Sequence, residues 1–440
     1  MKVLKFGGSS LADSSQFAKV KAIVESDPAR EVVVVSAPGK RNSGDNKITD
    51  LLYLVQAHIR YGVAYDNVMS MIRDRYREIA EGCGLSINVD ALIDEAFDGV
   101  GKNTSVDYIV SRGEYFSAKL MAEYLGYTFV DAADWMFFDY SGKVKSDKTE
   151  AKLRELKGIY GNIVTPGFYG VYPNGEVKTF PRGGSDITGA IAAGCLDADV
   201  YENWTDVSGI LMTDPRIVDH PKTIARVTYD ELRELSYMGA SVLHEDTVFP
   251  VRLKDIPVNI RNTNEPDAPG TIIREHFDDE LEEETERFIT GIAGKRNFSL
   301  ISVYKSRIGE DKLSLLRKVL EVFDRYNIPV EQIPSGVDSF SVVFPSDSIK
   351  TRKHELMHEL GDFEDIDNCA LTEGISLIAV VGRQMAYRTG VSGKIFKTLG
   401  DHHINIRTIE QGADEINIMV GVFNEDFEKA VRVLYNSFAK

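Results

Sequence analysis

The sequence predicts an α/β sandwich around a mainly parallel sheet, followed by two ferredoxin-like α+β units. Short apolar segments alternate with longer amphipathic segments through the first part of the chain. One of the apolar segments, Val32–Val35, lacks polar alternation, as a parallel strand buried on both faces requires. Near the end of the chain, a pattern of strand, helix, strand, turn, strand and helix occurs twice.

The strands expected in the first part are short, and each ends in a polar or glycine-rich loop. They are Lys2–Phe6, Glu31–Ser36, Tyr127–Ala132, Asn162–Phe168 and Asp199–Asp206. The amphipathic segments between them predict helices at Ser15–Glu25, Thr49–His58, Gly113–Leu125 and Ser185–Cys195. In a parallel sheet of this kind, ligands bind at the carboxyl ends of the strands.

An acidic segment, Phe277–Arg287, marks the expected boundary between the two parts of the chain, and we interpret it as a solvated linker. Beyond it, Asn327–Phe344 aligns with His403–Val420 without a gap, apolar residues and the Gly/Asp turn included. A duplicated unit follows from this match. The predicted domains are residues 1–285, 286–365 and 366–440.

Composition and charge limit the function classes. The chain has 440 residues, of which 43% are hydrophobic and 27% charged, as is typical of a soluble globular protein. Its net charge of −17 argues against nucleic acid or an anionic membrane as the main partner. Three separated cysteines, Cys83, Cys195 and Cys369, indicate reduced thiols. The sequence shows no signal-peptide pattern and no apolar run long enough to span a bilayer. We therefore expect a cytoplasmic protein.

Lys5 ends the first expected strand, and Gly7, Gly8, Ser9 and Ser10 lead into a helix-like segment. Backbone N–H groups at a helix start attract anions, glycines allow close approach, and the lysine adds a full charge. The spacing is not that of the common P-loop. Taken alone, this segment is more simply explained as an ordinary strand–helix turn.

Pro181–Ala190 repeats this chemistry, because Arg182 and two glycines precede Ser185 at an expected helix start. Asp186 falls in the first helical turn, where a carboxylate suits the helix dipole. A well-capped helix is the alternative explanation. Because this is the second glycine-rich helix start with a basic neighbour, we nevertheless favour anion binding at both helix starts.

Two more segments carry charge near expected strand or helix ends. Glu114, in Ser111–Glu114, either binds a substrate ammonium group or stabilises the start of the next helix. In Asn203–Arg216, Thr205 and Asp206 follow a strand. This segment either binds ribose and phosphate or forms a solvated loop.

In order and spacing, these four segments resemble the motifs of aspartate kinases within the amino acid kinase fold. They read KFGGSS, SRGE, RGGSD and WTDVSGI…TDPR. The duplicated unit resembles the paired ACT domains that regulate those enzymes, so the resemblance extends over nearly the whole chain. It implies phosphoryl transfer from ATP to the side-chain carboxylate of L-aspartate, giving 4-phospho-L-aspartate.

The resemblance also implies roles for individual residues. The catalytic residues would be Lys5 and Asp186. The ATP-binding residues would be Lys5, Gly7, Gly8, Ser9, Thr205, Asp206, Leu211, Arg216 and Ser241, and Mg²⁺ would be bound through the ATP phosphates. The aspartate-binding residues would be Thr49, Glu114, Phe168, Arg182 and Ser185. This agrees with the chemistry, because an ionised carboxylate needs no general base, only alignment and charge neutralisation.

The sequence departs from the family pattern at three positions. Ser241 stands in place of a lysine that would approach the nucleotide, Leu211 in place of a tyrosine, and Pro181 in place of a glycine. We expect an active kinase with weaker ATP binding. The alternative is a catalytically weak or inactive homologue that senses amino acids.

The ACT resemblance implies an amino-acid effector, with lysine expected and threonine as a second candidate. The implied effector residues are Ile308, Gly309, Val330, Glu331 and Asp338. They are equally well explained as turn and edge-strand residues. Because paired ACT units share ligand sites, a homodimer or a dimer of dimers is expected.

One competing motif is His354–His358, which matches the H-E-x-x-H pattern of zinc proteases. The pattern arises easily by chance in a helix rich in Glu, His and Leu, and the second repeat has no histidine there. We interpret it as a solvated helix face.

Overall fold

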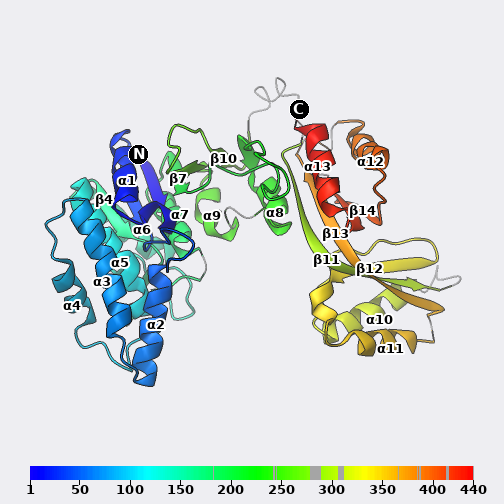
Figure 1. The fold of residues 1–440 in the computed structure, drawn as a ribbon, viewed down its shortest axis with the longest axis horizontal. Coiled ribbons are helices and arrows are strands. Elements are labelled where there is room, and N and C mark those ends of the chain that lie inside the picture. The colour runs from blue at the N-terminus through cyan, green and yellow to red at the C-terminus, as the bar shows by residue number, and fades with distance from the viewer. Residues whose placement is uncertain are drawn as a thin grey trace. The chain divides into compact units, whose positions relative to one another are not determined.

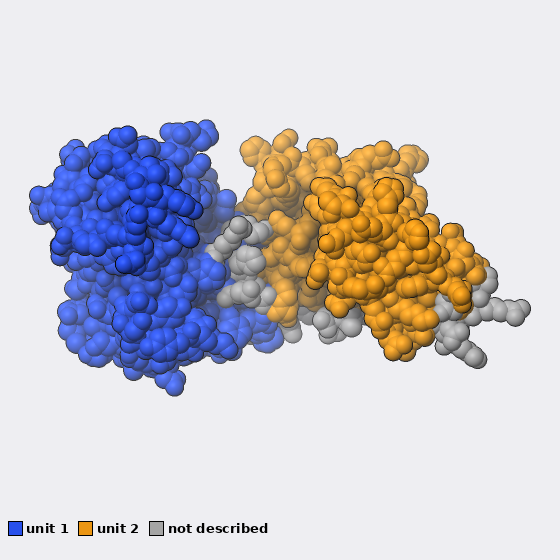
Figure 2. Space-filling model, turned by 90° about the horizontal axis from the view of Figure 1, so that it is seen from below, with its two compact units in different colours: residues 1–210, 225–229, 242–277 blue, residues 211–224, 230–241, 278–440 orange. Residues whose placement is uncertain are grey.

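The structure is a computed structural model that describes residues 1–181, 183–240, 243, 245–277, 289–305, 312–364, 366–383, 385, 388–412 and 416–439. The chain forms two compact units, shown in different colours in Figure 2. The first comprises Met1–Ile210, Ala225–Tyr229 and Val242–Phe277. The second comprises Leu211–Ile224, Asp230–Ser241 and Asp278–Lys440.

The first unit is built on an eight-stranded sheet with the strand order β3-β4-β2-β1-β7-β9-β10-β8 (Figure 1). Its strands are β1 (Lys2–Phe6), β2 (Arg30–Val35), β3 (Thr128–Phe129), β4 (Ile163–Pro166), β7 (Val200–Thr205), β8 (Arg226–Thr228), β9 (Val258–Asn262) and β10 (Thr271–Arg274). Neighbouring strands are parallel except β9 and β10, which are antiparallel. A separate hairpin pairs β5 (Tyr169–Val171) with β6 (Val177–Thr179).

Helices cover both faces of this sheet. One group comprises α1 (Ser14–Glu25), α2 (Ile48–Tyr61), α3 (Asp66–Gly82), α4 (Val89–Phe97) and α5 (Val106–Leu125). The other comprises α6 (Ser146–Tyr160), α7 (Gly184–Cys195) and α9 (Glu245–Arg252). Two short 3-10 turns, Gly8–Leu11 and Ala132–Asp134, follow β1 and β3.

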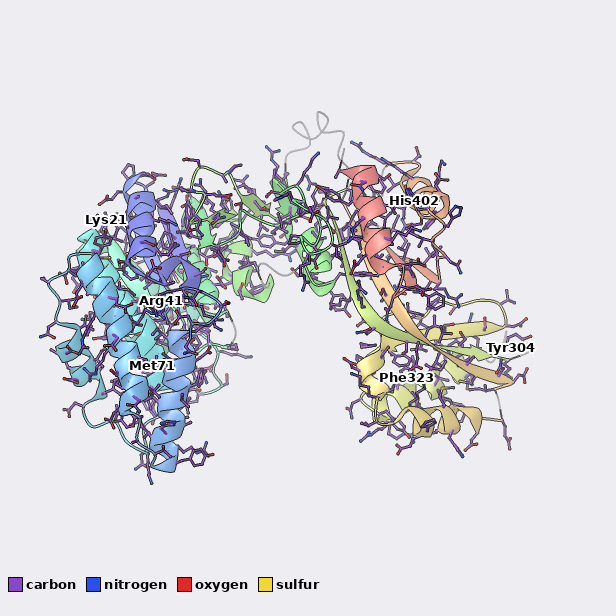
Figure 3. All side chains as sticks on the ribbon, viewed as in Figure 1. Lys21, Arg41, Met71, Tyr304, Phe323 and His402 are labelled. Carbon is purple, nitrogen blue, oxygen red and sulfur yellow. The ribbon has the colours of Figure 1, made fainter. Side chains whose placement is uncertain are left out.

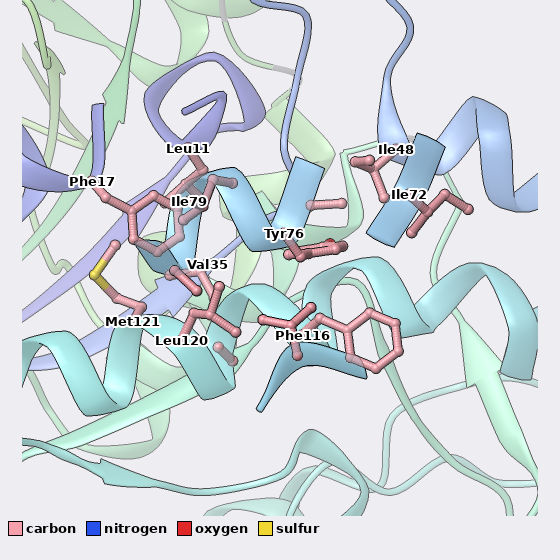
Figure 4. Close-up of a cluster of buried hydrophobic side chains, with 14 of the residues drawn as sticks. Leu11, Phe17, Val35, Ile48, Ile72, Tyr76, Ile79, Phe116, Leu120 and Met121 are labelled. Atoms are coloured by element: carbon pink, nitrogen blue, oxygen red, sulfur yellow. The ribbon is translucent and has the colours of Figure 1, made fainter. Parts of the chain in front are cut away.

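A large hydrophobic core lies between the sheet and helices α1–α5 (Figure 4). Leu4 and Phe6 of β1 face it together with Val35 of β2, because alternate residues of a strand point to the same face. Phe116 and Leu120 of α5 pack into the same core, one turn apart. Lys5, between Leu4 and Phe6, consequently points to the opposite face, where α7 lies.

The second unit is built on a five-stranded antiparallel sheet with the order β12-β11-β13-β15-β14. Its strands are β11 (Gly291–Tyr304), β12 (Ser339–Pro345), β13 (Asn368–Val381), β14 (Thr408–Gln411) and β15 (Asn417–Phe423). Its helices are α8 (Tyr229–Tyr237), α10 (Lys312–Arg325), α11 (Lys353–Gly361), α12 (Val391–Asp401) and α13 (Phe427–Phe438), with a 3-10 turn at Ser346–Ile349. The first residue of α8, Tyr229, belongs to the first unit.

The two repeats share the long strands β11 and β13. The second half of β11 pairs with β12, whereas β15 pairs with the second half of β13 from Ile375 onward. Helices α10 and α11 cover one half of the sheet and α12 and α13 the other (Figure 1). Phe323 of α10 is buried against Phe344, and Tyr304 ends β11 (Figure 3). The boundary at residues 365 and 366 stays a prediction, since both long strands serve both halves.

The predicted fold class is confirmed, with local corrections. The expected strand Tyr127–Ala132 is reduced to two residues, because a 3-10 turn begins at Ala132. In the first repeat, the segment before β12 forms only isolated bridges, at Gln332 and Ser335, and no strand. Within the described ranges, no helix is long and apolar enough to cross a membrane.

The largest correction concerns Ser111–Glu114, which we expected before a helix. Helix α5 already begins at Val106, because the hydroxyl of Ser105 accepts the backbone N–H of Tyr108 and caps the helix there. Glu114 therefore lies in the middle of α5, and a role in stabilising the helix start is excluded.

Candidate active site

Three polar side chains meet at the carboxyl ends of β1 and β7, under the first turn of α7. Lys5 Nζ lies 2.7 Å from Asp186 Oδ1 and 3.4 Å from Asn203 Oδ1, and Asn203 Nδ2 donates to Asp186 Oδ1 at 2.8 Å. The Lys5 and Asn203 residues are 7% and 4% exposed. A lysine this buried requires a partner, and the carboxylate of Asp186 supplies it.

The loops that follow β1 and β2 touch through glycines. The backbone N–H of Gly39 donates to Gly8 O at 2.7 Å. A Cβ at Gly39 would lie 2.7 Å from the carbonyl carbon of Gly8, and one at Gly8 would lie 2.9 Å from Ala37 O. Larger residues would push these loops apart, so both glycines are needed for their close approach.

The start of α7 is packed as tightly as these loops. A Cβ at Gly184 would lie 2.6 Å from the ring of Phe168. Phe168 has a positive φ of 79°, a strained conformation for a bulky residue. Two hydrogen bonds hold it, since its N–H donates to Thr188 Oγ1 at 3.0 Å and its carbonyl accepts from Phe180 N at 2.8 Å. The surrounding chain therefore fixes the Phe168 ring beside α7.

Glu114 brings a buried carboxyl group to the site from α5, and its residue is only 4% exposed. Its Oε1 accepts the backbone N–H of Ala37 at 3.1 Å, whereas its Oε2 has no hydrogen-bond partner among the described residues. Burial raises the pKa of Glu114 from 4.5 to about 8, against the lowering effect of the Ala37 N–H. Gly113 makes room for this approach, because a Cβ there would lie 2.8 Å from Ala37 Cβ.

Most of these groups line one cleft of about 1090 Å³ in the first unit. Its lining includes eleven of the predicted site residues: Lys5, Gly7, Gly8, Ser9, Thr49, Glu114, Phe168, Ser185, Asp186, Thr205 and Asp206. Thr49 lies in the first turn of α2, and Ser185 and Asp186 lie in that of α7. Residues predicted to bind phosphate and residues predicted to bind aspartate thus lie in the same cleft.

Four of the residues predicted to bind ATP or aspartate are not among the described residues that line this cleft: Arg182, Leu211, Arg216 and Ser241. Leu211 and Arg216 belong to the second unit, where Arg216 is highly exposed and pairs with Asp214 at 2.6 Å. Arg182 and Ser241 lie outside the described residues. Nucleotide binding by Leu211, Arg216 and Ser241, and carboxylate binding by Arg182, stay predictions.

Sequence reasoning did not single out Asn203, nor Lys40 and Lys47, two exposed cations that also line the cleft. Asn203 could have been found from strand order, because β1 and β7 are neighbours and Lys5 lies opposite Asn203 in their register. Lys40 and Lys47 lie in the loop between β2 and α2, as does Arg41, labelled in Figure 3. No periodic pattern in the sequence marks this loop.

The candidate effector residues are only partly described. Ile308 and Gly309 lie outside the described residues. Val330 is partly exposed, and the carboxylate of Glu331 accepts a hydrogen bond from the Tyr237 hydroxyl of α8. The backbone carbonyl of Asp338 accepts from Lys305 N at 3.1 Å. The effector role of these residues stays a prediction.

His354 and His358 lie one turn apart on α11. The ring of His358 is exposed, and its Nδ1 lies 2.8 Å from Asp362 Oδ2, one turn further on. In the part of the chain that the structure describes, no group of three or more His, Cys, Asp or Glu side chains could hold a metal ion.

Two regions of the chain match models of known protein families. Residues 1–262 match the model of the amino acid kinase family, and residues 378–438 match that of the ACT domain. Aspartokinase 3 of Bacillus subtilis is 35% identical over 457 aligned positions, which cover 100% of this chain and 98% of that protein.

Solved structures show the same similarity. The aspartate kinase of Clostridium acetobutylicum is 45% identical, with a TM-score of 0.91 and full coverage of both chains. Two structures of Escherichia coli aspartokinase III are 27% and 28% identical, with TM-scores of 0.74 and 0.70 and full coverage. One is in complex with lysine and aspartate (T-state), and the other with aspartate and ADP (R-state). The chain is a kinase that belongs to the amino acid kinase family, as an aspartokinase with a C-terminal ACT region.

Proposed function

We propose that the protein transfers the γ-phosphoryl group of ATP to the side-chain carboxylate of L-aspartate, giving 4-phospho-L-aspartate and ADP. The observation that carries this proposal is the buried carboxyl of Glu114, whose second oxygen has no partner in the described ranges, in the same cleft as the Lys5–Asp186 pair. The carboxyl of Glu114 suits an ammonium ion, and the ammonium of Lys5 suits an anion. A substrate that carries both charges, such as an amino acid with an acidic side chain, can reach both.

On the amino-acid side, Glu114 binds the α-ammonium group of aspartate. An ionised Glu114 gains an ion pair there that offsets its burial. Thr49 and Ser185, at two helix starts that line the cleft, donate hydrogen bonds to the substrate carboxylates. Arg182 clamps the α-carboxylate, and the Phe168 ring forms the apolar wall of this subsite.

On the phosphate side, Lys5 neutralises the charge of the transferred group, and Asp186 holds the ammonium of Lys5 in place. Gly7, Gly8 and Ser9, which line the cleft, bind the phosphates through backbone N–H groups. Thr205 and Asp206 lie along the nucleotide, with Leu211, Arg216 and Ser241. When bound, ATP with Mg²⁺ supplies the electrophilic phosphorus and further charge neutralisation.

Lysine is the proposed effector, acting through the ACT region as a feedback inhibitor. The support is that the E. coli relative was solved with lysine and aspartate in a T-state. We further propose that the chain acts in the cytoplasm as a homodimer or a dimer of dimers, with effector sites at paired ACT units.

The test is an ATP-dependent assay that traps the acyl phosphate as its hydroxamate. Aspartate should give hydroxamate and ADP in equal amounts, whereas glutamate, with one more methylene, should give little of either. Added lysine should inhibit the reaction. No hydroxamate from aspartate at any ATP concentration would reject the proposal in favour of an inactive, amino-acid-sensing homologue.

A further inference from the structure

We propose that Asn203 is a positioning residue for phosphoryl transfer, which fixes the ammonium of Lys5 against the carboxylate of Asp186. The inference rests on the proposed function, in which Lys5 neutralises the transferred group. It assigns a part of the reaction to a side chain that the residue pattern of the sequence did not mark.

The position of Asn203 follows from the strand register. β1 and β7 are parallel neighbours, and Lys5 lies opposite Asn203 in their pairing. Both side chains point to the face on which α7 lies, and both reach Asp186 in its first turn. Two strands and one helix thus converge on one carboxylate oxygen, Asp186 Oδ1.

The amide of Asn203 satisfies both charged neighbours at once. Its Nδ2 donates to Asp186 Oδ1 at 2.8 Å, and its Oδ1 accepts from Lys5 Nζ at 3.4 Å. The opposite orientation of the amide would set an oxygen against the carboxylate and an N–H group against the ammonium. The two charges therefore fix the amide orientation, and the amide in turn fixes the angle between them.

This arrangement orients the Lys5 ammonium toward the cleft. An ammonium has three N–H bonds, and Asp186 and Asn203 account for two of them. The Nζ atom lies beside Gly7, where a Cβ would come within 3.4 Å of it. The third N–H bond is then directed by the first two, so that a phosphoryl oxygen meets a preset donor.

Tyr201 of the same strand provides a matched comparison. Its side chain lies on the same face of β7, and its hydroxyl donates to the backbone carbonyl of Asp186 at 3.0 Å. It holds the backbone of α7 but touches neither charge. A residue that only anchors α7 and a residue that orients the charges can therefore be told apart by mutation.

The experiment compares Asn203→Leu and Asn203→Asp with the parent and with Tyr201→Phe. We expect both Asn203 variants to lose about ten- to hundredfold in kcat, with KM for aspartate and for ATP within about twofold of the parent. Tyr201→Phe should keep kcat within about twofold. Thermal melting establishes that each variant folds. If Asn203→Leu does not fold, the nearly isosteric Asn203→Asp carries the test.

A double-mutant cycle separates positioning from a general structural role. If Asn203 acts through the ion pair, Asn203→Leu should cost less than about threefold in the Asp186→Asn background. An equal loss in both backgrounds, an unchanged kcat in Asn203→Leu, or failure of both Asn203 variants to fold would overturn the inference. Lys5→Ala is run in parallel, because full turnover in that variant would instead reject the proposed function.

Discussion

Two groups of the cleft lining differ in how their charges are satisfied. The ammonium of Lys5 and the carboxylate of Asp186 are paired and joined by the amide of Asn203. The carboxyl of Glu114 is also buried, yet one of its oxygens has no partner among the residues described. The charges of the Lys5–Asp186 pair are already positioned, whereas the unsatisfied carboxyl of Glu114 is costly until a cation arrives. In the proposed function, the pair orients the reaction and Glu114 selects the substrate.

The first and largest test concerns the Lys5–Asp186 pair. Lys5→Ala removes the charge to which the proposed function assigns neutralisation of the transferred group, and leaves Asp186 without its cation. We expect a loss of at least about a thousandfold in kcat, because such electrostatic contacts act mainly in the transition state. ADP release in steady state measures it. Turnover within tenfold of the parent would mean that the Lys5–Asp186 pair has no part in the chemistry.

Substitution of Glu114 should change KM for aspartate. Glu114→Gln keeps an oxygen that can accept the N–H of Ala37 but cannot ionise to bind an ammonium group. We expect KM for aspartate to rise about a hundredfold, with a smaller change in kcat and little change in KM for ATP. Glu114→Ala, which also loses the hydrogen bond to Ala37, serves as the more severe variant. An equal rise in both KM values would contradict a role confined to the amino acid.

The pH dependence of substrate binding sharpens the same comparison. Burial raises the pKa of Glu114 to about 8, so only a minority of the free enzyme carries the carboxylate at pH 7. If only this form binds the ammonium of aspartate, the apparent KM should fall roughly fivefold between pH 7 and pH 8. Glu114→Gln should show a flat profile over this range. A profile in the variant as steep as that of the parent would place the titrating group elsewhere.

The smallest expected effect is on stability. The folded carboxyl keeps its proton up to about pH 8, whereas the unfolded one loses it near 4.5. The folded state therefore binds more protons in this window, and the free energy of unfolding falls as pH rises through it. Glu114→Gln should be more stable than the parent by about 3 kcal/mol at pH 7 and no more stable below pH 4.5. Denaturant unfolding at the two pH values without substrate measures this, and equal stability of both proteins at pH 7 would contradict it.

The sequence predicted the parallel sheet well, because Val32–Val35 and the βαβ alternation are local patterns that burial imposes directly. It located the strand end that carries Lys5 and the helix start that carries Asp186 for the same reason, since element ends can be read from apolar periodicity. It misplaced Glu114 relative to its helix, because the amphipathic pattern of α5 continues N-terminally beyond Gly113 to Ser105.

Other features depend on contacts between distant segments. Asn203 acquires its neighbours only when β7 pairs with β1, almost 200 residues away in the chain. The sharing of β11 and β13 between both repeats likewise depends on strand pairing, which the internal repeat alone does not specify. Sequence patterns therefore identified more of the residues that line the cleft than of the contacts between them.

The most direct test of the account measures protons released when aspartate binds. Titration calorimetry in buffers of different ionisation enthalpy at pH 7 gives this number. Because free Glu114 is mostly protonated and the bound form must be ionised, we predict release of close to one proton per aspartate in the parent and of none in Glu114→Gln. Binding by the parent without net proton release would contradict the assignment of Glu114 as the ammonium-binding carboxylate.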